Sequence, residues 1–177
     1  MNKITLIIFI AGTIVILLLS WWISLRHKHY HGIYRFFALE CIFLLTLLNY
    51  PVWFKDPFSF RQIISWILLI ISIPVGVAGF YSYYRIGKPS DKMEKTTQLI
   101  TVGIFKFIRH PLYLSLIILG FGIMMKDLNY VSIVVGFTNF ISLYFTAKTE
   151  EQEMIKKFGN RYVEYIKQTK MFMPFIL

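Results

Sequence analysis

Long apolar runs separated by short polar segments dominate the pattern of this chain. Five runs are candidates for membrane-crossing helices, because about 20 residues at about 1.5 Å each cover a hydrocarbon core of about 30 Å. These runs are residues 4–25, 36–54, 62–84, 111–125 and 128–147. The fourth is the shortest, and few residues separate it from the fifth. The pattern therefore predicts that the last two helices form a tight antiparallel hairpin.

The apolar fraction places the chain among membrane proteins. Of its 177 residues, 56% are hydrophobic and 16% are charged, which is more apolar than one soluble core of this size needs. The fold class predicted is all-α: a polytopic membrane protein with five transmembrane helices in one integral membrane domain, residues 1–177. Pro74 lies inside the third run and is expected to kink it, because proline has no N–H to donate.

Lysine and arginine are distributed unevenly over the predicted loops. The first loop, the third loop and the C-terminal tail carry 15 of them, whereas the N-terminus and the other two loops carry 4. Because positively charged loops stay in the cytoplasm, the N-terminus is predicted outside and the C-terminus inside. The net charge of +10 suits contact with anionic membrane lipids and requires no nucleic acid.

Two of the predicted cytoplasmic segments, the third loop and the C-terminal tail, are longer than simple connections between helices need to be. Residues 85–110 form a longer loop than compact proteins usually use. Apolar residues recur in the tail at spacings of three and four, which gives one apolar helical face. They are Ile155, Phe158, Tyr162 and Tyr165. Gly159 interrupts this pattern, and Asn160 is expected to cap a second helix. The tail is interpreted either as amphipathic helices lying on the membrane or as a lid that closes a cytoplasmic pocket.

The stretch "FIRHPLYL" marks the start of the fourth run. Pro111 suits the first position of a helix, so the unpaired N–H groups of that helix would face the cytoplasm and favour an anion. Arg109 and His110 add a fixed positive charge and a second donor. The hairpin would bring Glu150 and Glu151 to the same face, so a zwitterionic amino-acid group would fit there. The alternative is that Arg109 binds lipid phosphate and the glutamates are solvated.

The C-terminal half resembles a known family of membrane enzymes. From residue 99 to residue 174 the chain shows a leucine–aliphatic pair, a glycine, an aromatic residue, R-H-P-x-Y, an apolar hairpin, E-E, F-G-x-x-Y-x-x-Y and a final proline. This order is similar to that of the isoprenylcysteine carboxyl methyltransferases and the related phospholipid methyltransferases. The first three runs, residues 1–84, match only as membrane helices, which leaves residues 85–177 as the expected cofactor-binding half.

The resemblance implies that S-adenosylmethionine is the cofactor. It would be bound by Leu99, Ile100, Phe105, Arg109, His110, Pro111, Tyr113 and Glu150, with Glu151 as a further candidate. In this interpretation Glu150 holds the ammonium group of the cofactor. The carboxylate of the cofactor is held by Arg109, His110 and the start of the fourth helix. Arg109 and Glu150 are the expected catalytic residues. The partner would be a lipophilic methyl acceptor that enters from the bilayer.

The chain departs from the family pattern at four positions. Thr97 replaces a histidine and Phe105 replaces a tyrosine, so two hydrogen bonds to the cofactor are in doubt. Thr146 occupies the position of an arginine that binds the substrate carboxylate in the isoprenylcysteine enzymes, and Met171 replaces another arginine. Fewer positive groups count against a carboxylate acceptor. The sequence does not distinguish a prenylated cysteine, a phosphoethanolamine or an isoprenoid acid as the acceptor head.

Glu40 is the one formal charge inside a predicted span. Intramembrane carboxylates are often functional, so Glu40 and Thr146 are secondary candidates for the substrate site. Glu40 also lies close enough to a helix end to reach water or to pair with Arg35. Cys41, the one cysteine, is interpreted as a small buried apolar residue.

The segment "HKHYH" raises the question of a metal site. His27, His29 and His31 alternate, so they could converge on one side of an extended segment. Loop histidines at a membrane interface explain the same pattern, and no metal ligand is assigned here.

Two other functions compete with methyl transfer. An NADPH-dependent membrane reductase of the sterol type resembles the C-terminal half, but a dinucleotide needs more phosphate-binding cations. A transporter subunit or scaffold would need polar residues along a path through the bilayer, and the predicted spans contain few. Methyl transfer at the cytoplasmic face of the membrane is therefore preferred.

Overall fold

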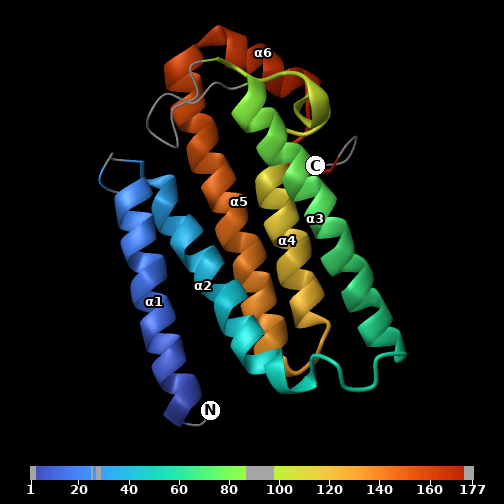
Figure 1. Ribbon diagram of the computed structural model, residues 1–177. Coiled ribbons are helices and arrows are strands. Elements are labelled where there is room, and N and C mark those ends of the chain that lie inside the picture. The colour runs from blue at the N-terminus through green and yellow to red at the C-terminus, as the bar shows by residue number, and fades with distance from the viewer. Residues whose placement is uncertain (1–2, 25, 27–28, 87–97, 174–177) are drawn as a thin grey trace.

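The five apolar runs all form helices in the computed structural model, which describes residues 3–24, 26, 29–86 and 98–173 (Figure 1). The α-helices are α1 (Lys3–Ile23), α2 (His31–Asn49), α3 (Phe60–Ile86), α4 (Pro111–Met124), α5 (Tyr130–Phe158) and α6 (Asn160–Gln168). Two 3₁₀ turns, η2 (Tyr50–Val52) and η3 (Gly103–Lys106), precede α3 and α4. The described fold is all-α, as the sequence predicts.

Four of the described helices, α1, α2, α3 and α5, are long and apolar enough to cross a membrane. Their outer faces carry large apolar side chains, among them Ile7 and Ile73, that would contact lipid. Helix α4 is apolar but has only 14 residues, which is about 21 Å at 1.5 Å per residue. The fourth predicted span is therefore shorter than a hydrocarbon core.

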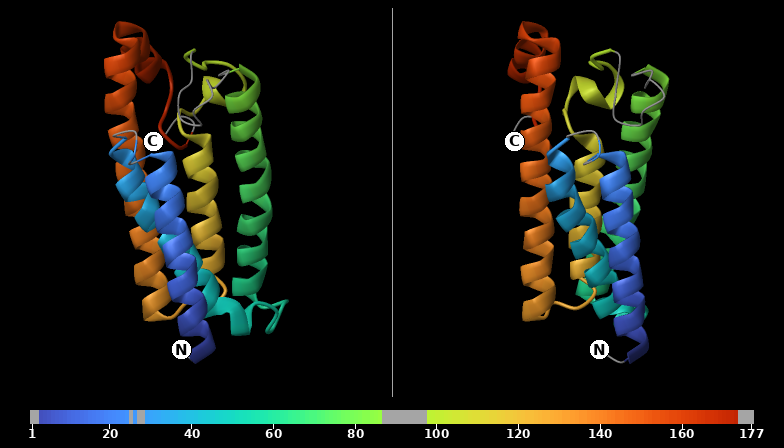
Figure 2. Two further views of the ribbon diagram at one scale, coloured as in Figure 1. Left: turned by 60° about the vertical axis from the view of Figure 1, so that its left-hand side comes forward. Right: turned by 90° about the vertical axis from the view of Figure 1, so that its left-hand side faces the viewer.

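The chain passes alternately between the two ends of the bundle (Figures 1 and 2). The start of α1, the segment between α2 and α3 and the turn between α4 and α5 lie at one end. The opposite end holds the described residues between α1 and α2, the η3 turn and α6. These two groups are those that the sequence assigns to opposite sides, and we name the second end, which includes η3 and α6, the α6 end.

Helix α4 is enclosed by its neighbours. Every residue from Pro111 to Met124 is buried or half-buried, and α4 packs against α2, α3 and α5. Glycines permit the close approach of α3: a Cβ on Gly79 would lie 3.2 Å from Pro111, and a Cβ on Gly122 would lie 3.2 Å from the backbone nitrogen of Leu69. An enclosed helix exposes less surface to lipid than the outer helices do, which fits the short length of α4.

Buried polar side chains connect the helices. The Asn49 amide donates to the carbonyl of Ile123, and the Asn139 amide donates to the carbonyl of Ala38, each at 3.0 Å. Such groups are stable inside a bundle only when they are hydrogen-bonded. They join α2 to α4 and α2 to α5.

The predicted boundaries of the second and fifth helices are wrong. Helix α2 already begins at His31, five residues before the expected start. The second helix ends at Asn49 instead of reaching residue 54, because Pro51 cannot donate the next helical hydrogen bond and the chain forms the η2 turn. The last span continues as one helix to Phe158, beyond the expected end at residue 147. Helix α3 continues through Pro74.

The predicted break at Gly159 is confirmed, but its cap differs. Gly159 has φ of +59° and ends α5, a conformation that glycine adopts easily. Asn160 is the first residue of α6, and Gly159 takes the N-cap position without a side-chain cap. The expectation that Asn160 caps α6 is therefore wrong.

Candidate active site

The residues before α4 pair with the C-terminal segment that follows α6. The Arg109 N–H donates to the carbonyl of Lys170 at 2.8 Å, and the His110 N–H donates to that of Met171 at 3.1 Å. In return the Lys170 N–H donates to the carbonyl of Phe107 at 3.2 Å. This short parallel pairing fixes the backbone that carries both Arg109 and His110.

The guanidinium of Arg109 forms hydrogen bonds within the protein. Its Nε donates to Oε1 of Glu151 at 2.6 Å, and its terminal nitrogen donates to the carbonyls of Ile166 and Thr169. The side chains of Arg109 and Glu151 are only 8% and 6% exposed. The Arg109–Glu151 pair therefore joins α5, α6 and the start of α4.

His110 lies between the two glutamates. Its Nδ1 is 3.6 Å from Oε2 of Glu150, and its Nε2 is 3.4 Å from Oε1 of Glu151. Nε2 is buried and has no well-aligned hydrogen-bond partner among the described residues. The ring stacks on Tyr113 with 5.4 Å between centroids. The predicted convergence of His110 with Glu150 and Glu151 is confirmed.

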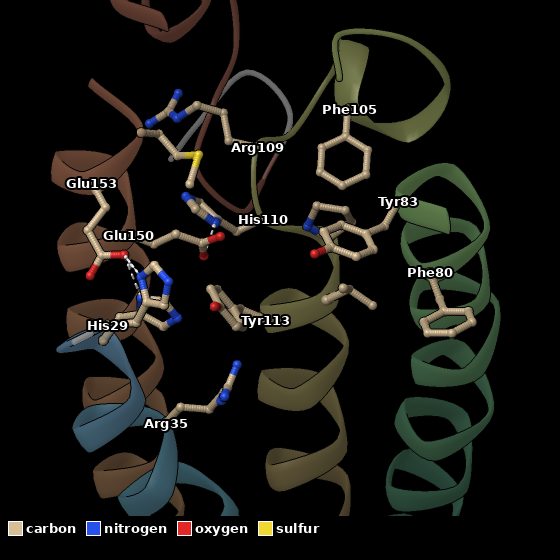
Figure 3. A pocket seen from close by; sticks show the side chains of 14 residues that line it. His29, Arg35, Phe80, Tyr83, Phe105, Arg109, His110, Tyr113, Glu150 and Glu153 are labelled. Carbon is tan, nitrogen blue, oxygen red and sulfur yellow. Dashed lines mark hydrogen bonds and ion pairs between the residues drawn. The ribbon is translucent and has the colours of Figure 1, made fainter. Parts of the chain in front are cut away.

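A cavity of about 230 Å³ adjoins this cluster. We call it the main cavity. Figure 3 shows Glu150 and Glu153 of α5 on one side of it, Phe80 and Tyr83 of α3 on the other, and Phe105 above. Arg35 lies below, and His110 is at the centre with its dashed contact to Glu150 (Figure 3). The main cavity thus combines aromatic walls with a few charged groups, as small-molecule sites commonly do.

A smaller cavity of about 70 Å³ continues from the main one. It shares Phe105, His110 and Glu150 with the main cavity and extends under α6. Its other walls include Leu99, Ile100, Phe158, Tyr162 and Tyr165. The apolar face predicted for the tail therefore borders this side cavity.

Tyr165 connects α6 to the η3 turn. Its hydroxyl donates to the carbonyl of Phe105 at 2.6 Å. Burial raises the pKa of Tyr165 well above its usual range, so the hydroxyl stays protonated and continues to donate. This bond keeps α6 over the side cavity.

The predicted site residues fall into two groups. Those that line at least one cavity are Leu99, Ile100, Phe105, Arg109, His110, Pro111, Tyr113 and Glu150. Glu151 is not among the described lining residues, because its carboxylate faces Arg109. Thr97 lies outside the described residues.

Thr146 and Glu40 lie apart from the described cavity walls. Thr146 is fully buried, and its hydroxyl donates to the carbonyl of Ser142 in its own helix. Glu40 lies between α1 and α2, where its Oε1 accepts a hydrogen bond from Thr13. The described contact of Arg35 is to Ser24. A substrate role for Thr146 and Glu40 stays a prediction.

Comparison with known proteins decides the family. Residues 60–161, more than half of the chain, match the sequence model of a family described as phospholipid methyltransferase. The chain belongs to the phospholipid methyltransferase family. The match begins at α3, earlier than the stretch from residue 99 that carries the resemblance in the sequence. It confirms that the chain is an integral membrane protein of a methyltransferase family.

A second comparison found a similar protein that is named for an isoprenylcysteine acceptor. The chain is 32% identical over 89 residues to the protein-S-isoprenylcysteine O-methyltransferase of Schizosaccharomyces pombe. The aligned region is 49% of this chain and 37% of that relative. The chain thus aligns with less than two-fifths of the length of this relative.

Several residues line the main cavity of this phospholipid methyltransferase family member although the sequence did not predict them there. Glu153 is three residues after Glu150, so the two share one face of α5. His29 precedes α2, His31 is its first residue and Tyr83 lies on α3. The sequence singled out His29 and His31 only as part of a possible metal pattern, whose third member, His27, lies outside the described residues. The helical spacing could have indicated Glu153. The other three depend on which helices are neighbours, which the apolar pattern does not specify.

Proposed function

We propose that this chain is an S-adenosylmethionine-dependent methyltransferase that acts on a lipophilic acceptor at the cytoplasmic interface of the membrane. One observation carries the proposal: a carboxylate, Glu150, and an imidazole, His110, meet at the start of α4 on the wall of a partly aromatic cavity. A zwitterionic amino-acid group needs an acceptor for its ammonium group beside donors for its carboxylate. Membership of the phospholipid methyltransferase family supports this assignment.

The residues present fit the cofactor. Glu150 would accept hydrogen bonds from the ammonium group of the cofactor. The carboxylate of the cofactor would accept hydrogen bonds from the first N–H groups of α4, which have no partner within the helix. His110, which lines both cavities, offers its imidazole as one more donor for the cofactor carboxylate. Phe105, Leu99 and Ile100 would enclose the adenine. When bound, S-adenosylmethionine supplies a methyl group on a positively charged sulfur.

In our proposal Arg109 is a positioning residue that does not contact the cofactor. Its guanidinium is held by Glu151 and by two backbone carbonyls, so its contacts fix His110 and the start of α4. This role replaces the direct binding of the cofactor carboxylate that the resemblance implies.

The chain's own residues would mainly align the reactants and exclude water. Displacement at a methyl group needs the acceptor atom, the methyl carbon and sulfur in line, and holding them so lowers the barrier by pre-ordering. The aromatic walls and α6 would keep water from the cavities. A carboxylate acceptor needs no base, whereas an amine acceptor must lose a proton.

Cofactor binding tests the proposal directly. The purified full chain in lipid nanodiscs would be titrated calorimetrically with S-adenosylmethionine and, in parallel, with NADPH. We expect binding of the first alone. Glu150→Gln should weaken it by about ten- to a hundredfold, since a hydrogen bond to a charged group is worth about 1.5–3 kcal/mol.

The matched control is Glu164→Gln, because Glu164 is 61% exposed and pairs with Lys167 on α6. This variant should bind as the parent does. Binding of NADPH alone would replace the proposal with the reductase alternative, and binding of neither would favour a transporter or scaffold.

The acceptor can be identified by transfer of label. The relative from Schizosaccharomyces pombe is named for an isoprenylcysteine acceptor, and the family is named for phospholipids. Membranes containing the chain would be incubated with methyl-labelled cofactor and separated into lipid and protein. Label in prenylated protein identifies a carboxylate acceptor, whereas label in phosphatidylethanolamine derivatives identifies an amine.

A further inference from the structure

Two histidines and a glutamate converge at the edge of the main cavity, outside the proposed cofactor contacts. Nδ1 of His29 lies 2.8 Å from Oε2 of Glu153, and Nδ1 of His31 lies 3.1 Å from the same oxygen. The three ligand atoms are all within 4.8 Å of one another. Figure 3 shows the dashed contacts from Glu153 toward the His29 side of the cavity.

Two members of the cluster lie on packed helices, and His29 precedes the first of them. His31 is the first residue of α2, and Glu153 lies on α5. These two helices pack against each other along the bundle. His31 is 5% exposed, and both His29 and Glu153 are 22% exposed. The folded chain therefore brings the three groups together without further movement of either helix.

Two imidazole nitrogens and one carboxylate oxygen are a ligand set for divalent transition metals. A tetrahedral ion bound at about 2.0–2.1 Å separates its ligand atoms by about 3.3 Å. The observed separations of 2.8 and 3.1 Å differ from this by a few tenths of an ångström. Small side-chain rotations would therefore make room for an ion.

A second observation concerns the other carboxylate oxygen. Oε1 of Glu153 is buried and has no hydrogen-bond partner among the described residues. A buried acceptor without a partner is costly. A metal ion beside the Glu153 carboxylate would offset this cost, because it would neutralise the negative charge. The hydrogen bonds to Oε2 leave Oε1 without a partner.

We propose that His29, His31 and Glu153 bind one divalent transition-metal ion of the Zn²⁺ type. Three protein ligands leave a fourth coordination position open. All three residues line the main cavity, so this position would face the space where the acceptor group reacts. The ion would place a positive charge on the α2 side of the cavity, beside Arg35.

Metal binding by the full chain tests this site independently of methyl transfer. The chain, purified without a histidine tag and reconstituted in nanodiscs, would be stripped with chelator and titrated with Zn²⁺ and with Co²⁺. We expect one Zn²⁺ per chain by elemental analysis. With Co²⁺ we expect the visible absorption bands of a four-coordinate nitrogen–oxygen site.

Single-ligand variants locate the ion. Glu153→Gln retains shape and hydrogen-bond acceptance but removes the charged ligand, and His29→Gln removes one nitrogen. Each should weaken Zn²⁺ binding by at least about tenfold, because even groups that only support a ligand change metal affinity by 10–100-fold. Glu164→Gln, on α6, is the matched control and should bind Zn²⁺ as the parent does.

A structural effect of the variants can be separated from loss of the site. Zn²⁺ should raise the Tm of the parent chain, because a ligand that binds only the folded state stabilises it. If a variant does not fold, the stoichiometry and Co²⁺ spectrum of the parent still decide. Absence of Zn²⁺ binding by the folded parent, or unchanged binding in both folded variants, would overturn the proposal. Titration of the same samples with S-adenosylmethionine tests cofactor binding separately.

Discussion

Neighbouring glutamates on α5 face different surroundings. Successive residues on a helix point about 100° apart, so Glu150 reaches the main cavity while Glu151 faces Arg109. The side chain of Glu150 is 28% exposed and that of Glu151 is 6% exposed. The two adjacent glutamates therefore have different roles. Glu150 lines the main cavity, and Glu151 is buried in an ion pair with Arg109.

This difference predicts opposite effects of the same substitution. Glu151→Gln should lower the free energy of unfolding by about 3 kcal/mol or more, because removing one member of a buried ion pair leaves the other charge uncompensated. Glu150→Gln should change stability little and weaken cofactor binding instead. Thermal denaturation of both variants in one detergent measures the difference, and equal Tm values would contradict it.

Lys126, in the turn between α4 and α5, is the most deeply buried cation described. It is 1% exposed, its ammonium donates to Gln62 at 2.9 Å, and it lies 3.5 Å from the ring centre of Trp66. Burial lowers the pKa of Lys126 to about 8 from 10.5. The contact with Trp66 favours the charged form and limits the shift.

The lowered pKa predicts how stability depends on pH. Below about pH 8 both folded and unfolded chains carry the charge, so the full cost of burying it is present. Between pH 8 and 10.5 the folded chain releases this proton first, so the contribution of Lys126 to stability should rise with pH. We expect the Tm difference between the parent and Lys126→Met to change in favour of the parent from pH 7.5 to 9.5. A difference that does not vary with pH would contradict the lowered pKa.

At the scale of elements, α4 depends on small residues at its contacts. A Cβ on Gly120 would lie 2.4 Å from Oδ1 of Asn139, whose amide donates to Ala38 across to α2. Gly120→Ala therefore forces α4 and α5 apart or breaks this hydrogen bond.

We expect Gly120→Ala to cost about 1–3 kcal/mol of stability, the usual range for overpacking a core. The measurement is thermal denaturation in detergent. Thr138→Ala serves as control, because Thr138 is exposed on the outer face of α5 and its hydroxyl contacts its own helix. An unchanged Tm for Gly120→Ala would contradict the packing described here.

The apolar runs predict that the helices exist better than they predict where the helices end. Lys148 to Lys157 contain charges that end the apolar run, but nothing there breaks a helix, so α5 continues to Gly159. The motif around Pro111 and the glutamate pair could be predicted to meet, since a hairpin of adjacent helices brings them together. The pairing of Arg109 with Lys170 depends on how the tail folds back over α4, which no local pattern contains.

At the scale of the whole molecule, the two ends of the bundle differ in charge. The segments that the sequence assigns to the same side as α6 carry 15 of the 19 lysines and arginines. The positive-inside rule therefore predicts that the α6 end, with the candidate site, faces the cytoplasm.

Cysteine labelling tests this orientation. The chain has one cysteine, Cys41, so Cys41→Ser provides a background without thiols. Phe58→Cys at the end opposite α6 should react with a membrane-impermeant maleimide on intact cells, because Phe58 is 89% exposed. Glu164→Cys on α6 should react only after lysis. The reverse result would place the candidate site outside the cell.

The shortness of α4 has a consequence for lipid chemistry. At about 21 Å, α4 leaves roughly 9 Å of a 30 Å hydrocarbon layer uncrossed, and the main cavity begins at the end of α4 where Pro111 lies. A lipid whose polar head is to be modified could thus be reached near the depth of its first methylene groups. Its chains would stay among those of other lipids, so extraction from the bilayer would not limit turnover, and the rate should vary with bilayer thickness.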